Sequence, residues 1–251
     1  MFIETINSTN DYLKQHPEET VIRTAFQTAG RGQQGNGWES EHGQNLLFST
    51  RLRTGLKADE QWLINMMVAV ALYKTLNAKL YTLNAPRSTL NAQLSIKWPN
   101  DLYWGDKKLA GILIEHTLCG GRIADSIVGI GLNLNQTEWH SDAPNPISLK
   151  QTTGAEYNPE QMMQAFLNEL TTIQADTSHL KQEYMSALYR REGWYWWEER
   201  EVSTTPTMNG QRIEQSFEAR IADITEQGEL VLQTRDNQIR TYHFKQIKYI
   251  L

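Results

Sequence analysis

The sequence has little of several residue types and patterns that would indicate particular functions. Its 251 residues include one cysteine, Cys119, and no apolar run of membrane-spanning length. A single cysteine excludes an internal disulfide and a metal site built from cysteines. The first residues show no basic region followed by an apolar core, so we predict neither a secretory signal nor a membrane helix. The expected location is the cytoplasm, with no membrane partner.

Two further signals are weak. The six histidines are scattered along the chain without the spacing of metal ligands. The formal net charge is -5, and a mildly acidic chain is not suited to binding a polyanion, so nucleic acid is not an expected partner. A hydrophobic content of 39% and a charged content of 21% describe an ordinary globular protein that can bury a full core.

Periodicity predicts an α+β protein of two domains. We expect strands over 21–27 and 46–52, and helices over 60–76, 159–170 and 178–190. Ser8 or Thr9 is expected to cap an N-terminal helix and Asn158 the helix at 159. Short alternating runs after residue 193 predict a small antiparallel barrel. We therefore divide the chain into a first domain over 1–195 and a barrel over 196–251.

The most informative stretch runs from Ile96 to Glu115. Trp98-Pro99 ends an apolar-leaning run, two short polar side chains follow, and an apolar run begins after a lysine pair. We interpret this stretch as two strands joined by a tight polar connection. An ordinary hairpin with a solvated, charged turn is the alternative.

The polar residues of this stretch are candidates for anion chemistry. Asn100 and Asp101 could bind a hard cation through oxygen, as in magnesium–phosphate sites. Lys108 lies nearer the apolar run, so we expect it to reach a phosphate or a carbonyl oxygen. Lys107 lies in the turn and is expected to be exposed.

A glycine-rich loop between 28 and 45 is the second candidate site. Gly30, Gly32, Gly35 and Gly37 would let the backbone approach a ligand closely and point N–H groups at it. Arg31 adds a planar cation for phosphate or carboxylate, and Trp38 could cover an apolar ligand face. The loop fits neither a phosphate-binding Walker loop nor a dinucleotide fingerprint. The alternative is a surface loop with Trp38 packed in the core.

Two more segments carry open alternatives. The segment Gly129-Ile130-Gly131-Leu132-Asn133 places glycines inside a strand, which indicates either close approach of backbone or ligand or a bulge. In the second case Asn133 would only satisfy local backbone groups. The aromatic run 194–197 is expected to pack at the junction of the two domains, with a docking surface for a protein partner as the alternative.

Five segments, taken in order, resemble the biotin protein ligases. They are Ser8-Thr9-Asn10, the loop from Gln27 to Trp38, Lys97-Trp98-Pro99-Asn100-Asp101, Lys108-Leu109-Ala110-Gly111-Ile112-Leu113-Ile114-Glu115, and Gly129 to Asn133. The ordered set covers nearly the whole chain and carries more weight than any single motif. Two departures stand out: no DNA-binding N-terminal domain is expected here, and Gln33 stands where many members have arginine. Gln34 and Asn36 replace further basic residues of the loop.

The resemblance implies a fold, a reaction and partners. The fold would be a class II synthetase-like catalytic domain, with a central mixed or antiparallel sheet and packed helices, followed by an SH3-like barrel. The reaction would join biotin to AMP, using ATP and Mg²⁺, and then transfer biotin to a lysine of the biotin carboxyl carrier domain of a carboxylase. A homodimer through an exposed strand edge is left open.

The resemblance also implies roles for individual residues. The catalytic residues would be Arg31, Asp101 and Lys108, with Lys108 on the acyl phosphate and Asp101 orienting the acceptor lysine or taking its proton. The biotin-binding residues would be Ser8, Thr9, Asn10, Gln27, Gly30, Arg31, Gly32, Gln33, Lys108 and Gly111. The ATP-binding residues would be Arg31, Gln33, Trp38, Asn100, Lys108 and Asn133, and magnesium would lie near Asp101 and Asn133.

Other readings of the same motifs remain. A lipoate or octanoate protein ligase would share the fold and the adenylate chemistry, although Lys97 to Asp101 and the loop ending in Trp38 favour biotin. A binding module that senses a small ligand without catalysis would be expected to lack Arg31 or Lys108, and both are present. A DNA-binding repressor is disfavoured by the acidic balance of the chain.

Overall fold

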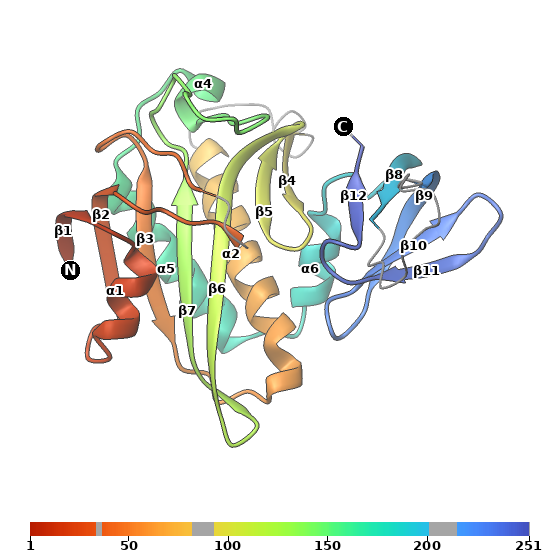
Figure 1. The fold of residues 1–251 in the computed structure, drawn as a ribbon, viewed down its shortest axis with the longest axis horizontal. Helices are drawn as coiled ribbons and strands as arrows, with labels where there is room; N and C mark the ends of the chain where they lie inside the picture. The colour runs from red at the N-terminus through yellow and green to blue at the C-terminus, as the bar shows by residue number, and fades with distance from the viewer. Residues whose placement is uncertain (34–36, 82–92, 201–214, 251) are drawn as a thin grey trace, which may run out of the picture.

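The computed structural model describes residues 1–33, 37–81, 93–200 and 215–250 (Figure 1). Residues 34–36 of the glycine-rich loop and most of the polar connection expected over 81–91 lie outside the described residues. A large mixed sheet and a smaller C-terminal sheet lie side by side, with helices packed on the large sheet. The predicted α+β class is confirmed.

Seven strands form the large sheet in the order β1-β2-β3-β7-β6-β5-β4. Their bounds are β1 Phe2–Ile6, β2 Val21–Gln27, β3 Leu46–Leu52, β4 Leu94–Lys97, β5 Asp101–Trp104, β6 Lys107–Cys119 and β7 Arg122–Leu132. β1 runs parallel to β2 and the remaining neighbours are antiparallel. The strands expected at 21–27 and 46–52 are therefore confirmed with their bounds.

The helices cover the sheet unequally. Four longer segments are α1 Thr9–Gln15, α2 Gln61–Tyr81, α5 Pro159–Ala175 and α6 Leu180–Ser186; the short elements η2 Ala58–Glu60 and α4 Leu149–Thr153 complete the set. Figure 1 shows α2 and α5 behind the sheet and α1 in front of it. The front face is therefore only partly covered by a helix, and a site can form there.

Strand alternation sends neighbouring residues of β3 to opposite faces. Phe48 packs edge-on against Phe166 of α5, with ring centroids 5.5 Å apart. The next residue, Ser49, turns its hydroxyl to the other face, where it donates to Asn10 of α1. The back of the sheet thus carries the apolar core, while the front carries buried polar groups that position α1.

The caps of two helices agree with the sequence. The Ser8 side chain accepts a hydrogen bond from the Asp11 backbone N–H at the start of α1. The Asn158 side chain does the same for Gln161 at the start of α5. Both contacts satisfy donors that the first helical turn leaves unpaired.

The stretch from Ile96 to Glu115 corrects one prediction. It contains parts of three strands, β4, β5 and β6, where two were expected, because the chain reverses at 98–100 and again at 105–106. The segment Arg122–Leu132 is the single strand β7, which pairs with both β3 and β6.

Five antiparallel strands form the C-terminal sheet in the order β11-β10-β9-β8-β12. They are β8 Tyr195–Glu199, β9 Gln215–Ile224, β10 Leu230–Thr234, β11 Ile239–Tyr242 and β12 Ile247–Tyr249. Among these described strands β11 and β12 do not pair with each other, so closure into a barrel stays a prediction. The division of domains at 195/196 stays one as well.

The aromatic run 194–197 divides between packing and exposure. Trp197 is fully buried and lies 4.3 Å from the Tyr249 ring, centroid to centroid. Trp196 is 55% exposed. The expectation of packing therefore holds for Trp197 and not for Trp196.

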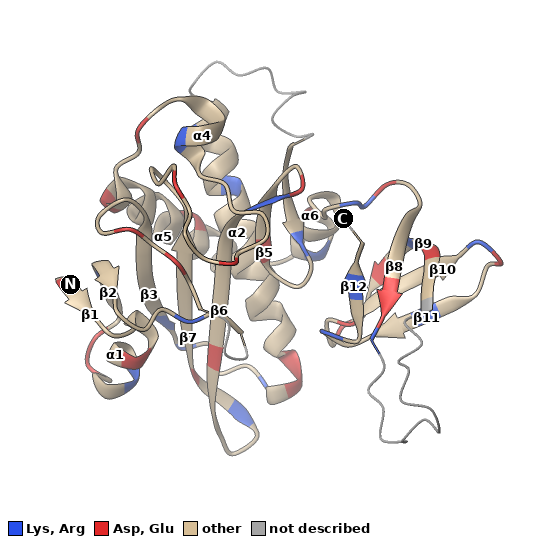
Figure 2. Cartoon of the chain, turned by 45° about the horizontal axis from the view of Figure 1, so that its top comes forward, with Lys and Arg blue, Asp and Glu red and all other residues tan. Residues whose placement is uncertain are grey.

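Charge is distributed without a single dominant sign. Figure 2 shows basic and acidic positions interleaved over both sheets. Within the described residues, no helix has the length and apolar content that crossing a bilayer requires.

Candidate active site

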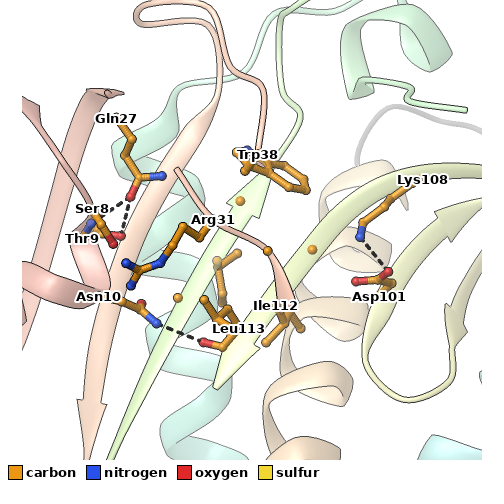
Figure 3. A pocket seen from close by; sticks show the side chains of 15 residues that line it. Ser8, Thr9, Asn10, Gln27, Arg31, Trp38, Asp101, Lys108, Ile112 and Leu113 are labelled. Carbon is orange, nitrogen blue, oxygen red and sulfur yellow. Dashed lines mark hydrogen bonds and ion pairs between the residues drawn. The ribbon is translucent and has the colours of Figure 1, made fainter. Parts of the chain in front are cut away.

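A hollow on the front face of the large sheet collects most of the predicted site residues (Figure 3). It surrounds about 490 Å³ of space, part of which is open to solvent. We call it the first hollow. Its lining consists of Ser8, Thr9, Asn10, Gln27, Arg31, Gly32, Trp38, Asp101, Lys108, Gly111, Ile112, Leu113, Gly129, Ile130 and Gly131.

Three glycines form the floor of the first hollow and allow close approach of other side chains. A Cβ atom on Gly129 would lie 2.3 Å from Asn10 Oδ1, and one on Gly131 would lie 2.4 Å from the Trp38 ring. A Cβ on Gly111 would also meet the Trp38 ring, at 2.8 Å. The strand pairing runs through Gly129 and Gly131 without a register shift, so the bulge alternative is wrong. The glycines are required because side chains from elsewhere lie on the sheet.

Hydroxyl and carboxamide groups form a connected network at one end of the first hollow. Gln27 Oε1 accepts hydrogen bonds from the Thr9 backbone N–H at 2.8 Å and from Thr9 Oγ1 at 3.0 Å. Ser49 Oγ lies 2.7 Å from Thr9 Oγ1 and 2.6 Å from Asn10 Oδ1. Because Oε1 is engaged, the Gln27 amide presents its Nε2 donors to a ligand.

Arg31 reaches into the first hollow from the glycine-rich loop and is already paired. Its Nη2 donates to Asp11 Oδ1 of α1 at 2.6 Å. This hydrogen bond raises the pKa of Arg31 and lowers that of Asp11. The pair ties the loop to α1, and the guanidinium keeps further N–H donors for an anion.

Lys108 and Asp101 form the charged end of the first hollow. Lys108 Nζ lies 2.6 Å from Asp101 Oδ2, and both side chains remain about one-third exposed. The ammonium also lies 5.8 Å from the centroid of the Trp38 ring. Lys107 is exposed, as predicted. Of the two lysines, only Lys108 faces the hollow.

A second hollow adjoins the first on the other side of Trp38. Its lining includes the predicted residues Gly30 and Asn133 and shares Gln27, Trp38 and Lys108 with the first hollow. The rest of its lining comes from Thr28, Ala29, Gly37, Glu39, Trp139 and the segment 141–146.

Three buried polar atoms around the second hollow have no hydrogen-bond partner. They are Trp38 Nε1, Trp139 Nε1 and Asn133 Oδ1. The other end of Asn133 donates to the Ile147 carbonyl at 3.0 Å, so the expectation of local backbone bonding holds for its amide nitrogen. Buried polar atoms are rarely left unpaired, so these three atoms mark a place where the packing leaves hydrogen-bonding capacity unused.

Two predicted residues do not reach either hollow. Asn100 is 2% exposed and donates to Asn65 of α2 at 2.9 Å, on the back of the sheet. Its neighbour Asp101 is the first residue of β5 and lines the first hollow on the front. Gln33 is described but lines neither hollow. The ATP contact proposed for Asn100 is therefore not supported by the geometry.

The residues assigned to magnesium do not form a ligand cluster. No group of three histidine, cysteine or carboxylate side chains suited to a metal occurs in the described part of the chain. The Asp101 carboxylate is engaged by Lys108, and Asn133 offers one amide oxygen. This donor set does not fit a metal held by the protein alone, since such cations take several oxygen ligands.

Some residues of the site were not found from the sequence. Ser49 looked like an ordinary strand residue, and Asp11 like a residue of the first helical turn. Trp139 and the segment 141–146 belong to no motif, yet they form a wall of the second hollow. Each of these residues meets its partner across a large sequence separation, and no local pattern marks such a contact.

The described site and fold agree with one protein family. The biotin/lipoate A/B protein ligase family matches residues 2–133, which is more than half of the chain. The chain therefore belongs to that family. The bifunctional ligase/repressor BirA of Bacillus spizizenii is 31% identical over 156 residues, which cover 60% of this chain and 44% of that protein.

Two further similar proteins point to the same family. The biotin–[acetyl-CoA-carboxylase] ligase of Paracoccus denitrificans is 33% identical over 141 residues, 55% of each chain. The chain thus spans about half the length of these curated relatives. The fold matches biotin protein ligase from Aquifex aeolicus, solved in complex with biotin and ATP, at a TM-score of 0.74, 19% identity and coverage of 100% and 98%. The catalytic fold expected from the sequence is thereby confirmed.

Proposed function

We propose that this protein activates biotin with ATP to form biotinyl-5'-AMP and transfers biotin to a lysine of a biotin carboxyl carrier domain. One observation carries the proposal: a single hollow joins a network of hydroxyls and carboxamides, with the cation Arg31 beside it, to a second cation, Lys108, at its other end. A cyclic urea needs both donors and acceptors, and a carboxylate meeting a triphosphate needs cations.

The first step joins two anions. The biotin carboxylate oxygen attacks the α-phosphorus of ATP, a P–O bond forms, and the bond to the leaving pyrophosphate breaks. Thr9 and Gln27 would hold the ureido ring while Arg31 and Lys108 offset the charge on the carboxylate and phosphate. Most of the rate then comes from positioning and charge stabilisation. No step is assigned to protein-bound magnesium, because the described residues do not offer it a site.

The second step needs a neutral amine. The acceptor lysine attacks the acyl carbon of biotinyl-AMP, a C–N bond forms, and the C–O bond to AMP breaks. Asp101 is the carboxylate of the first hollow and would orient the amine or take its proton. Lys108 would polarise the acyl oxygen, but only after it leaves the ion pair with Asp101 at 2.6 Å.

The second hollow is the proposed place for the nucleotide. It shares Trp38 and Lys108 with the first hollow, so an adenylate would extend through the boundary between the two. Asn133 and Trp139 also line this hollow and would lie beside the nucleotide.

Biotin is favoured over lipoate by the polar end of the first hollow. Thr9 is 4% and Asn10 3% exposed, and both belong to a hydrogen-bonded network that a dithiolane ring could not complete. Relatives named as biotin ligases point in the same direction.

The decisive measurement is ATP–pyrophosphate exchange with purified protein and biotin, lipoate, octanoate or no acid. Exchange that depends on biotin is expected. Exchange that requires lipoate or octanoate would replace the proposal by that ligase activity. Tight biotin binding without exchange would instead indicate a binding module.

A second assay addresses the acceptor. A purified biotin carboxyl carrier domain with its target lysine is expected to become labelled, and the same domain with that lysine replaced by arginine is the matched control. Equal labelling of both would exclude specific transfer to the carrier.

A further inference from the structure

Lys97 lies beside the first hollow, and neither step of the proposed reaction gives it a role. It stands directly opposite Asp101 in the antiparallel pair of β4 and β5. Directly opposed residues point to the same face of a sheet. Since Asp101 also contacts Lys108 of β6, a row of charges runs across three strands on the front face, with a carboxylate between two lysines.

Aromatic side chains hold Lys97 in place. Its Nζ donates to Tyr103 Oη at 3.0 Å and lies 4.4 Å from the centroid of the same ring. The ring of Tyr249, from β12 of the C-terminal sheet, lies 5.1 Å away. Tyr103 is 4% and Tyr249 6% exposed, so both rings are fixed by packing. The C-terminal sheet thereby reaches the charge row of the large sheet.

The protein keeps this cation where burial opposes its charge. Burial lowers the pKa of Lys97 from 10.5 to about 8, and Lys108 and Arg190 act in the same direction. Asp101 and Asp106 oppose the lowering. The neighbouring carboxylate of Asp101 therefore offsets part of the cost of burying this charge.

We propose that Lys97 is a positioning residue that frees Lys108 for the reaction by sharing the Asp101 carboxylate. When Lys108 turns to the phosphate or the acyl oxygen, Asp101 keeps Lys97 as a neighbouring cation. A carboxylate left without a cation in a partly buried site costs free energy, and Lys97 reduces that cost. The inference rests on the proposed function and adds the C-terminal sheet to the site through Tyr249.

The test is a double-mutant cycle in biotin-dependent ATP–pyrophosphate exchange. Lys97→Met keeps the apolar stem and removes the charge, so Lys108 should stay on Asp101 and exchange should fall about tenfold, within the range of couplings between neighbouring charges. In the Asp101→Asn background no carboxylate retains Lys108, so Lys97→Met should change exchange less than about twofold. The cycle compares the fold-change in exchange caused by Lys97→Met in each background. The absolute exchange rate of the Asp101→Asn background therefore need not equal that of the wild type.

Three variants sharpen the cycle. Lys97→Arg retains a positive charge at the same place and is expected to restore exchange to within about threefold of the wild type. Lys107→Met removes an exposed lysine at the start of β6 and is the matched control, with no expected change. Tyr249→Leu removes the ring from β12 and is expected to lower exchange in the same background-dependent way as Lys97→Met.

The outcomes separate the inference from the proposed function. If Lys97→Met lowers exchange by the same factor in both backgrounds, Lys97 has only a structural role and the inference is overturned. The proposed function stands in that case, because exchange still depends on biotin. Wild-type protein that shows no biotin-dependent exchange overturns both.

Discussion

The two cations of the site are held alike but carried by different kinds of structure. Arg31 and Lys108 each lie 2.6 Å from a carboxylate, Asp11 and Asp101 respectively. Each carboxylate also has a second lysine nearby. Lys14 lies 3.7 Å from Asp11, and Lys97 stands opposite Asp101 in the strand pair.

The difference lies in the elements that carry the pairs. Lys108 and Asp101 belong to paired strands of the large sheet, so their backbones are fixed relative to each other. Arg31 belongs to the glycine-rich loop and reaches α1, twenty positions away in sequence. Loops carry groups that adjust to ligands, while strands place groups that must be accurate before the ligand arrives. We therefore expect Lys108 to control the chemical step and Arg31 to control binding.

The largest effect is expected at Lys108. Lys108→Ala removes the strand-borne cation, and adenylation measured by pyrophosphate exchange should fall by about 10²–10³, as for other lost stabilisers of developing charge. Lys107→Ala is the matched control and should behave as wild type. Full exchange activity in Lys108→Ala would remove the distinction between the two cations.

Asp101→Asn should separate the two steps of the reaction. Transfer from preformed biotinyl-AMP to the carrier domain is expected to fall about a hundredfold, within the usual range for a lost general base. Exchange should fall less, since Lys108 still offsets the phosphate charge. An unchanged transfer rate in single-turnover assays would exclude Asp101 as the group that receives or orients the amine.

Arg31→Ala tests the loop-borne cation. The KM values for biotin and ATP should rise about tenfold while kcat changes less, because the lost interaction serves binding in both ground and transition states. Arg31→Lys should recover only part of the loss, since an ammonium lacks the planar donor set. A fall in kcat as large as that of Lys108→Ala would show that the loop takes an equal part in the chemistry.

Lys97→Met should raise stability at neutral pH. A pKa lowered from 10.5 to about 8 corresponds to roughly 3 kcal/mol against the charged form. The lost hydrogen bond to Tyr103 offsets about 1 kcal/mol of the gain. The free energy of unfolding in urea is therefore expected to increase by about 1–2 kcal/mol at pH 7.

The pH dependence of this difference has a definite sign. The folded protein binds fewer protons than the unfolded chain between pH 8 and 10.5, so the stability of the wild type rises through that window. The advantage of Lys97→Met should shrink there and stay constant below pH 8. The groups that face Lys97 are Asp101, Asp106, Lys108, Arg190, Tyr103 and Tyr249. A variant less stable than wild type at pH 7 would show that the interactions of the Lys97 ammonium with Tyr103 and the nearby carboxylates outweigh the cost of burying its charge.

Asp11→Asn should have the smallest effect. The Arg31–Asp11 pair is exposed by 43% and 33%, and such pairs contribute a few tenths of a kcal/mol to stability. The thermal midpoint should therefore change little, while the affinity for ATP should rise two- to threefold as Arg31 is released. A drop in affinity, measured by calorimetry, would mean that Asp11 orients Arg31 toward the ligand.

The sequence predicted those parts of the fold that depend on local patterns. The strands at 21–27 and 46–52 have clear apolar content and turn signals, and their bounds agree with the structure. The sequence analysis did not predict the turn at 98–100 between β4 and β5. The polar pair after Pro99 was instead interpreted as part of one connection between two strands. Distinguishing one turn from two requires knowledge of which strand pairs with which, and pairing is a long-range property.

The site was predictable where residues stand in ordered motifs. Thr9, Gln27, Arg31 and Lys108 meet in one hollow although a hundred positions separate the first from the last. Asn100 was misplaced because it lies in the turn at 98–100 and bonds to Asn65 of α2, and a motif does not show which way a turn residue points. The role of Asp11 as the counter-ion of Arg31 could not be predicted, because Asp11 does not line the hollow and belongs to none of the motifs.

Trp38 has a practical consequence. Its ring lies on Gly111 and Gly131 at the boundary of the two hollows, with a buried, unpartnered Nε1. Indole emission depends on the polarity around the ring, and a ligand in either hollow would change that surrounding. The protein therefore carries an intrinsic fluorescence reporter at the point where the two substrates would meet. Comparison with Trp38→Phe separates its signal from that of the other seven tryptophans, including Trp139 of the second hollow.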